Sequence, residues 1–366
     1  MIRYLRAASR KKLGGTVLLR LDFNTKDDWR MRAVVPTITF LLKTSDHIVI
    51  LSHRGRPNGV DKKFSLRKNA ATLTRLLGRK VIFLEKFNFP AARAKIAASP
   101  RGSVFLLENL RFDPGEEKND PKFARKLASL GDCYVNDAFA VSHRANASVA
   151  AITKFLPSYA GLELEREIVS LSRVMKNPRH PLVFIAGGAK AADKLSVLKY
   201  FRTKADWFLL GGGPANTILA LRGMDVKKSV RDMDPKDVAA MKRFSTAKSI
   251  IIPSDFVWHG NLIWDIGPKT VAKFNEKIMK ARTIIWSGPL GLIERPAYAR
   301  GSLAVARAVV RNRRAFSVTG GGETVMFLKK YRLDKKFSFI STGGGAMLDF
   351  LAGEKLPGIT ALGGSD

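Results

Sequence analysis

Residues 182–190 read LVFIAGGAK, in which an apolar run leads directly into two glycines and a lysine. Such a run is typical of a buried strand of a parallel sheet followed by a tight turn. The second half of the chain repeats it as WFLLGGG (207–213), FSVTGGG (316–322) and FSFISTGGG (337–345). Glycine lets a ligand approach the backbone, and the helix that follows offers free N–H groups to a phosphate. These turns therefore predict a phosphate-binding edge of a parallel sheet.

The glycine turns differ from two well-known nucleotide-binding patterns. Neither GxxxxGK[ST] nor GxGxxG occurs in the sequence, which disfavours P-loop enzymes and Rossmann dehydrogenases. The sequence also contains no His/Cys/Glu set with the spacing of a metal cage, and no serine within GxSxG. Metallohydrolases and serine hydrolases are therefore disfavoured as well.

Apolar, β-rich runs alternate with helix-period stretches along almost the whole chain, as in parallel α/β proteins. In the first half we predict strands over residues 16–21, 47–51, 80–83, 103–107 and 133–136. Asp120 and Pro121 followed by Gly131 predict a helix over residues 122–130.

A further helix is predicted between the two halves. Apolar residues recur at Leu164, Ile168, Leu171 and Met175 before Asn177-Pro178 interrupts the pattern. The predicted fold class is α/β, with two Rossmann-like, doubly wound parallel-sheet lobes joined by this helix. We expect an N-terminal lobe over 1–161, a joining helix over 162–178, a C-terminal lobe over 179–346, and a segment over 347–366 that packs back toward the N-terminal lobe.

The composition limits the classes of protein that the chain can belong to. It has 366 residues, 46% of them hydrophobic, and one cysteine, so we expect two domains with apolar cores and no internal disulfide. We find no apolar run that approaches the roughly 20 residues needed to span a bilayer. These features predict a protein of the reducing cytoplasm, without a membrane partner.

The net charge of +33 is the unusual feature of the composition. Residues 1–178 hold 33 basic and 16 acidic residues, and residues 179–366 hold 31 and 15, so the two halves carry +17 and +16. Nucleic-acid-binding arms normally concentrate their basic residues in one block. The even spread therefore leaves two interpretations open, a solvated cationic surface or a field that attracts phosphorylated anions.

Basic and amide side chains follow the predicted strands of the first half. They occur in LRLDFN (19–24), SHRGR (52–56), LLENLRF (106–112) and NDAFAVSHRAN (136–146). Strand ends of one parallel sheet meet at one edge, and arginine binds an oxyanion with two parallel hydrogen bonds. The pattern predicts a pocket for a small phosphorylated, carboxylated molecule, with Asp22 placed to orient a guanidinium or bind a hydroxyl.

These stretches resemble the phosphoglycerate kinase family from end to end. The matching segments include LRLDFN, SHRGRPNG, NDAFA, HRANAS, GGAKAADK, DIGPKT, GGGET and STGGGAMLDFLAGEKLPG. The resemblance implies reversible phosphoryl transfer between 1,3-bisphosphoglycerate and ADP, which gives 3-phosphoglycerate and ATP, with Mg²⁺, by direct in-line transfer when the lobes close. It also implies a glycolytic or gluconeogenic monomer with small-molecule substrates and no dedicated nucleic-acid partner.

The resemblance also implies a role for individual residues. The acid-substrate site falls on Asp22, Asn24, Arg30, His53, Arg56, Arg111, Arg144 and Asn146. The nucleotide site falls on Lys190, Lys194, Gly212, Gly213, Ser287, Glu294, Glu323 and Thr324, with Glu323 as the metal ligand. The catalytic set is Arg30 and Lys194, expected to stabilise the oxygens of the transferring group, with Gly344 and Gly345 near that group. We further expect Lys190 and Lys194 to lie one helical turn apart, so that both face the phosphates.

The chain departs from the family pattern at several of these positions. Glu323 replaces the usual aspartate, Asn146 a histidine, Ser287 an asparagine, and Arg54 a leucine. Glu323 is one methylene longer, and the octahedral geometry of Mg²⁺ tolerates little displacement of a ligand oxygen. Two alternatives therefore remain open: a catalytically weakened homologue that binds nucleic acid or another anionic surface, and an enzyme with a changed acid substrate.

Overall fold

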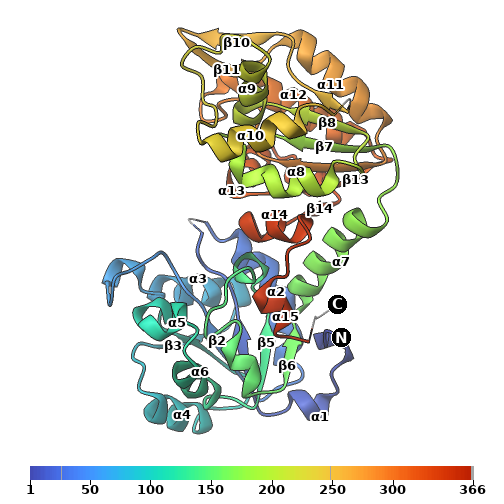
Figure 1. The fold of residues 1–366 in the computed structure, drawn as a ribbon. Coiled ribbons are helices and arrows are strands. Elements are labelled where there is room, and N and C mark those ends of the chain that lie inside the picture. Colours follow the sequence, from blue (N-terminus) through green and yellow to red (C-terminus); the bar gives the residue numbers. More distant parts are fainter. Residues whose placement is uncertain (26, 248, 364–366) are drawn as a thin grey trace. The chain divides into compact units, whose positions relative to one another are not determined.

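The computed structural model describes residues 1–25, 27–247 and 249–363, which form two compact units (Figure 1). Unit 1 consists of Met1–Ile168 together with the C-terminal residues from Lys355 onward, and unit 2 consists of Val169–Glu354. Residues 347–354, which we expected to pack toward the N-terminal lobe, therefore belong to unit 2. They include most of helix α14 (Gly345–Leu351), which packs on helix α8 (Leu195–Phe201) of the same unit.

Unit 1 is built on a six-stranded parallel sheet with the order β3-β4-β2-β1-β5-β6. Its strands are β1 (Thr16–Arg20), β2 (His47–Leu51), β3 (Val81–Leu84), β4 (Ser103–Leu107), β5 (Cys133–Asn136) and β6 (Ser158–Ala160). Its helices are α1 (Arg10–Leu13), α2 (Trp29–Leu42), α3 (Arg67–Leu77), α4 (Phe89–Ala97), α5 (Pro114–Glu117), α6 (Pro121–Ala128) and α15 (Pro357–Thr360). All five strands predicted here are present, whereas the sequence analysis did not identify β6.

Burial explains why these segments form strands. Residues 17–20 of β1 are all buried, because the central strand of a parallel sheet is covered on both faces. Helices α2 and α3 share one hydrophobic core with alternate residues of β1 and β2, such as Val17, Leu19, Ile48 and Ile50. Asp120 caps α6 through an oxygen that accepts from the Lys122 N–H at 2.8 Å, as the sequence predicted.

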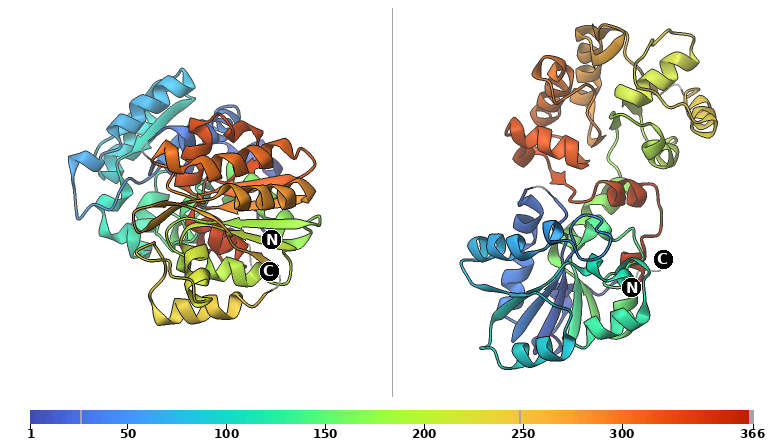
Figure 2. Two further views of the ribbon diagram at one scale, coloured as in Figure 1. Left: turned by 90° about the horizontal axis from the view of Figure 1, so that it is seen from above. Right: turned by 90° about the vertical axis from the view of Figure 1, so that its left-hand side faces the viewer.

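Unit 2 contains a second six-stranded parallel sheet, with the order β14-β13-β12-β7-β8-β9. Its strands are β7 (Leu182–Ala186), β8 (Trp207–Leu210), β9 (Ile250–Ile251), β12 (Thr283–Ser287), β13 (Phe316–Gly320) and β14 (Phe339–Ile340). Its remaining helices are α9 (Gly212–Leu221), α10 (Pro235–Phe244), α11 (Pro268–Lys280), α12 (Arg300–Arg311) and α13 (Gly322–Lys330). The sheet lies between α11 and α12 on one side and α8 and α10 on the other (Figure 2). Two parallel-sheet α/β units confirm the predicted fold class.

Unit 2 also contains an antiparallel pair that the sequence analysis did not identify. Strands β10 (Phe256–His259) and β11 (Leu262–Ile266) pair through a turn at Gly260-Asn261, and their register shifts between Val257 and Trp258. The turn and its apolar flanks (FVWHGNLIWDI) were the available signal. Its position matters because this pair borders the cavity described below.

Helix α7 (Leu162–Lys176) leads from unit 1 into unit 2 and begins at a buried carboxylate. Asp137 follows β5, and its Oδ1 accepts a hydrogen bond from the Leu164 N–H at 2.8 Å. A side chain at Gly161 would lie 2.4 Å from the Asp137 carboxyl, so glycine is required there. Burial raises the pKa of Asp137 to about 7.

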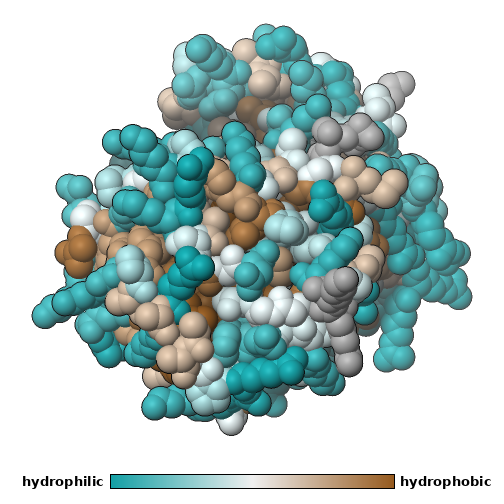
Figure 3. All heavy atoms as spheres, turned by 90° about the horizontal axis from the view of Figure 1, so that it is seen from below, coloured by the Kyte–Doolittle hydropathy of each residue, from teal (hydrophilic) through white to brown (hydrophobic). Residues whose placement is uncertain are grey.

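The surface is rich in charged groups. Hydrophilic side chains border the face seen in Figure 3, with apolar side chains gathered between them. Among the described residues, no helix has both the length and the apolar content that a membrane span requires.

Because burial raises the pKa of Asp137, we expect its contribution to the free energy of unfolding to depend on pH. Its pKa is raised in the folded state, so folding favours the protonated form, and this contribution is lost as the pH rises toward about 7. Asp137→Asn keeps the oxygen acceptor for Leu164 without a charge. Urea unfolding at pH 5 and pH 8 should show the variant gaining stability relative to the wild type at the higher pH. A difference that stays constant between the two pH values would contradict this assignment.

Candidate functional site

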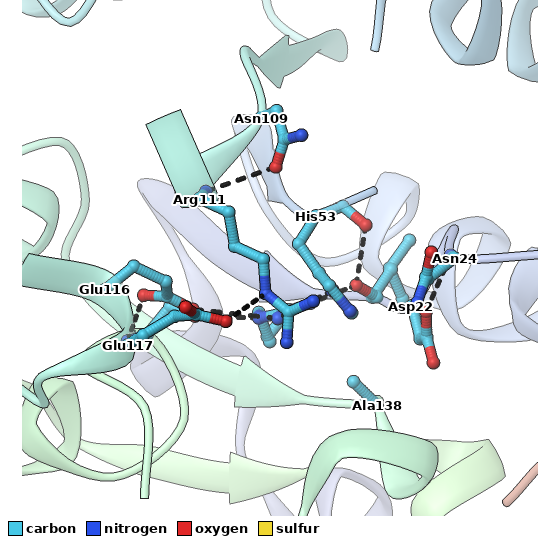
Figure 4. Close-up of polar contacts among 12 residues, drawn as sticks. Asp22, Asn24, His53, Asn109, Arg111, Glu116, Glu117 and Ala138 are labelled. Atoms are coloured by element: carbon cyan, nitrogen blue, oxygen red, sulfur yellow. Dashed lines mark hydrogen bonds and ion pairs between the residues drawn. The ribbon is translucent and has the colours of Figure 1, made fainter. Parts of the chain in front are cut away.

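The carboxyl ends of neighbouring strands of unit 1 bring the predicted acid-site residues together. Asp22 and Asn24 follow β1, His53 follows β2, Arg111 follows β4, and Arg144 lies in the segment after β5. In Figure 4 the Arg111 guanidinium lies between Glu117 on one side and His53 on the other. The sheet order β4-β2-β1-β5 makes these strand ends adjacent.

A buried cation organises this edge. Arg20, the last residue of β1, is 1% exposed, and its Nε donates to the Ser148 Oγ at 2.8 Å. Its Nη1 donates to the Leu21 carbonyl oxygen, and its Nη2 lies 3.8 Å from the Glu116 carboxylate. The Ser148 hydroxyl donates onward to Glu116 at 2.6 Å. Arg20 was expected among the pocket cations, whereas its guanidinium is buried and engaged by residues of the protein.

Arg20 also determines the state of His53. The guanidinium Nη2 lies 3.1 Å from the imidazole Nδ1. Because a guanidinium has no acceptor, Nδ1 must accept this hydrogen bond and the proton must sit on Nε2. Burial, followed by the charges of Arg20 and Arg111, lowers the pKa of His53 well below its ordinary value. His53 is therefore a neutral N–H donor.

Asp22 and Arg30 form an ion pair at this edge. Arg30 Nη1 lies 2.6 Å from Asp22 Oδ2, and the Asn24 N–H donates to Asp22 Oδ1 at 2.7 Å. Burial acts to raise the pKa of Asp22, but the guanidiniums of Arg30 and Arg20 and the Asn24 N–H outweigh it, so the pKa lies below its ordinary value. The carboxylate stays charged and holds Arg30 in a defined position.

Arg111 is anchored on two sides. Its Nη1 donates to the Gly55 carbonyl oxygen at 2.5 Å, and its Nε lies 3.1 Å from Glu117 Oε1. The Gly55 N–H donates to Asn24 Oδ1 at 2.8 Å, which ties the loop after β2 to the residues after β1. Burial lowers the pKa of Arg111, as do the nearby charges of Arg144 and Arg20.

Three residues lie apart from this group. Arg56 is exposed in the loop after Gly55, and no hydrogen bond joins it to the other acid-site residues that the structure describes. Asn146 is buried, and its carbonyl oxygen accepts from the Val149 and Ala150 N–H groups. Arg54, which had motivated a changed acid substrate, borders a different cavity.

In unit 2 the glycine turns approach one another. A side-chain carbon at Gly187 would lie 2.0 Å from the Pro289 carbonyl oxygen, and one at Gly213 would lie 2.0 Å from that of Ala189. Gly212 has φ +54°, where glycine is favoured, and closely approaches Gly188. The turns after β7, β8 and β12 therefore pack closely against one another, backbone to backbone. The sequence analysis assigned these glycines to ligand approach alone.

Beside these closely packed turns lies a cavity of about 400 Å³. It is lined by four predicted nucleotide-site residues, namely Gly212, Gly213, Glu294 and Glu323. Trp264 and Phe256 of the antiparallel pair also line it, together with Asp265. The cavity thus combines a polar, backbone-rich side with an aromatic side.

The remaining predicted residues occupy different positions. Lys194 is 7% exposed, and its Nζ donates to the Lys190 carbonyl oxygen at 3.3 Å, while the Lys190 side chain is exposed. The helical-turn expectation for this pair is wrong, because only Ala192–Lys194 form a 3₁₀ turn. Burial lowers the pKa of Lys194, against the opposing effect of nearby carboxylates that include Glu323.

Ser287 and Thr324 act on the turn after β12. The Thr324 Oγ1 accepts from the Gly288 N–H at 3.1 Å, and the Ser287 carbonyl oxygen accepts from the Gly187 N–H at 3.0 Å. Both residues are buried and support the turn. Gly344 and Gly345 begin α14, and a side-chain carbon at Gly344 would lie 3.5 Å from the Gly321 Cα.

Comparison with known proteins assigns the family. The sequence model of the family described as phosphoglycerate kinase matches residues 11–354. The chain belongs to the phosphoglycerate kinase family. It is 39% identical to the phosphoglycerate kinase of Dictyoglomus turgidum over 95% of this chain and 96% of that protein. It is 41% identical to the phosphoglycerate kinase of Moorella thermoacetica over 94% of this chain and 95% of that protein.

Solved structures agree with this assignment. The phosphoglycerate kinase of Pyrococcus horikoshii matches with a TM-score of 0.87 and 34% identity, over 99% of this chain and 98% of that one. The enzyme from Coxiella burnetii matches with a TM-score of 0.85 and 32% identity, over 99% of both chains. Family membership makes this chain a glycolytic kinase, and it supports the kinase over the cationic binding protein that the sequence left open.

Phosphoglycerate kinases use ATP and ADP, and the donors present fit a metal held partly by the nucleotide. Among the described residues, no three His, Cys, Asp or Glu side chains form a metal-binding group. Glu323 is an exposed carboxylate in the first turn of α13, and it lines the cavity. Mg²⁺ characteristically takes one or two carboxylates and completes its shell with phosphate oxygens and water. Glu323 can serve as that carboxylate.

The Arg20 contact predicts the protonation state of His53. At pH 6 an ordinary histidine is largely protonated, whereas His53 should remain neutral with its proton on Nε2. Nitrogen-15 NMR of the imidazole at pH 6, with free histidine as the reference, measures this directly. A doubly protonated His53 at that pH would show that Arg20 does not set its state.

Proposed function

We propose that this chain transfers a phosphoryl group reversibly between 1,3-bisphosphoglycerate and ADP, giving 3-phosphoglycerate and ATP. The observation that carries the proposal is the set of residues at the carboxyl ends of the strands in each of the two sheets. The edge in unit 1 gathers arginines around a neutral histidine, and the edge in unit 2 gathers glycine turns around a cavity. One edge suits a small phosphorylated acid and the other a nucleotide.

The acid would bind to the cations of unit 1. Arg111 and Arg144 supply positive charge close to His53, whose pKa both guanidiniums lower. His53 Nε2–H adds a neutral donor, and Asn24 and Asp22 border the same edge. We assign the phosphate and carboxylate of the acid to these arginines, because guanidinium forks match both groups. Arg56 and Asn146 remain proposed contacts of this substrate.

The nucleotide would bind to the cavity of unit 2. Helix α9 begins at Gly212, and the positive end of its helix dipole suits phosphate oxygens. The aromatic side formed by Phe256 and Trp264 suits a nucleobase, and Glu294 suits the ribose hydroxyls. Lys190 is exposed at the neighbouring turn and adds a charge for the phosphates.

The transfer itself needs positioning and charge neutralisation rather than a covalent nucleophile. Lys194 is a buried cation beside the glycine turn, with its Nζ 3.5 Å from a side-chain position at Gly188. We assign Lys194 and Arg30 to the oxygens of the transferring group, with the backbone at Gly344 and Gly345 nearby. Arg30 is already oriented by Asp22. Mg²⁺, when bound at Glu323, supplies further neutralisation of phosphate charge.

Each proposed site consists of residues from one chain, so a monomer suffices for the reaction. A glycolytic role is consistent with a cytoplasmic location. The cationic surface can raise the local concentration of anionic substrates.

A coupled assay tests the proposed function. Purified protein with Mg²⁺, ADP and 1,3-bisphosphoglycerate should form ATP far above background, and related phosphorylated acids should serve less well. Absence of turnover with Mg²⁺ present would reject the proposal. Faster turnover of another acid would instead favour a changed acid substrate.

Lys194→Met should lower kcat by about two orders of magnitude or more, because a buried charge aimed at the transferring group is lost. ADP affinity should change much less, since the residues that line the cavity remain. The exposed Lys199→Met on α8 is the matched control and should leave both constants unchanged. Equal losses in affinity and in kcat would contradict a transition-state role.

If Glu323 holds the metal, its substitution should change the Mg²⁺ dependence of the activity. Glu323→Gln removes the carboxylate while keeping its length, so the Mg²⁺ concentration for half-maximal activity should rise about tenfold. Glu323→Asp should keep most of the Mg²⁺ response. An unchanged Mg²⁺ titration for Glu323→Gln would show that the metal is held elsewhere.

A further inference from the structure

A second cavity in unit 1 lies next to the acid site without sharing its residues. It has a volume of about 790 Å³, and its lining consists of Arg54, Val60, Lys62, Lys63, Ser65, Arg67, Lys68, Glu85, Lys86, Phe87, Glu108, Phe112, Asp113 and Pro114. His53, Arg111 and Arg144 are not among the residues that line it. Arg54, directly after His53, does line it, and so connects the two regions along the chain.

Basic side chains dominate this second cavity. Four of them have no ion-pair partner among the residues that the structure describes, namely Arg54, Lys62, Lys68 and Lys86. Arg54 is half-buried, and its backbone N–H and carbonyl groups are fixed by Asn109. Its guanidinium has no ion-pair partner among the described residues and is therefore available to an anion.

The carboxylates on the cavity lining are already engaged. Glu85 lies 2.7 Å from Arg67, and Glu108 accepts hydrogen bonds from residues 65 and 66 at 2.8 Å each. Asp113 caps helix α5 through its Oδ1. The unpaired cations consequently leave the cavity with a net positive charge.

A helix N-terminus adds to this charge. Helix α3 has 11 residues and begins at this cavity, and its N-cap Leu66 makes no side-chain cap. The N–H group of Lys68, a residue of the cavity lining, has no hydrogen-bond acceptor within the described part of the chain. Free N–H groups at a helix start favour phosphate.

One side of the cavity is apolar. Phe87 is half-buried and stacks on Phe89 with the rings 9° from parallel, and Phe112 and Pro114 lie on the same lining. Val60, also on the lining, is 79% exposed. An inorganic anion gains no binding free energy from such a surface, whereas a flat apolar ring is stabilised when it is buried against it.

We propose that this second cavity binds an organic phosphate that carries a flat apolar ring, such as a nucleoside phosphate, separately from both substrate sites. The phosphate lies on Arg54, Lys68 and the start of α3, and the ring lies on Phe87 and Phe112.

Amide NMR of the full-length protein with 1-naphthyl phosphate tests this proposal, because Lys68 and Phe87 line this cavity and neither is a residue of the acid site. Saturating 3-phosphoglycerate is present to occupy the acid site. The Lys68 and Phe87 signals should shift saturably, and inorganic phosphate should bind at least about tenfold more weakly. Absence of a saturable shift, or equal affinity for the two probes, would overturn the proposal.

Paired variants locate the binding. Arg54→Leu with Lys68→Ala should weaken 1-naphthyl phosphate at least about tenfold, and the exposed Lys68→Ala alone should weaken it about threefold. Arg93→Leu with Lys95→Ala on α4 removes the same charge from an exposed helix and should change the affinity less than about twofold. Equal weakening by the two pairs would mean that the probe responds only to overall charge.

Discussion

The Arg20 guanidinium inside unit 1 is the interaction on which the acid site depends. It joins the end of β1 to Ser148, to the imidazole of His53 and to the carboxylate of Glu116. Burying a charge is costly, and removing one partner of a buried ion pair typically costs about 3–5 kcal/mol. An arrangement of the strand ends that left Arg20 without its partners would therefore be disfavoured. Arg20 also keeps His53 neutral, so the charge offered to a substrate comes from Arg30, Arg111 and Arg144.

In unit 2 the positions of the turns after the strands are fixed by close backbone packing rather than by a buried charge. Its glycine turns pack backbone to backbone, closely enough that a single side-chain carbon would clash with a carbonyl oxygen. The free space is the cavity between these turns and the antiparallel pair β10 and β11. The cavity offers an aromatic surface to a nucleobase, and Lys190 and Lys194 after β7 are the cations available to its phosphates.

Much of this organisation could be predicted from the sequence, because strand and turn signals are local. The apolar run before Gly187 and the capping pair Asp120-Pro121 identified their elements directly. Burial of a charge is not local. Arg20 is buried against Ser148 and Glu116, and these partners are distant in sequence, so no local pattern predicts its burial.

Other features also depended on distant contacts. The Asp137 contact with α7 and the backbone contact between Gly213 and Ala189 join segments that no spacing rule relates. Lys190 and Lys194 were expected on one helical face, but a 3₁₀ turn separates the exposed lysine from the buried one. The hairpin turn at Gly260-Asn261 was a local signal that the sequence analysis did not use.

Calorimetric binding of 3-phosphoglycerate to the wild type and to Arg20→Lys tests most directly the claim that a buried cation organises the acid site. Arg20 is 1% exposed and cannot touch the ligand, and lysine cannot reach Ser148, Leu21 and His53 together. With circular dichroism confirming that the variant is folded, the affinity should fall at least about tenfold. A folded variant that binds within about twofold of the wild type would contradict the claim.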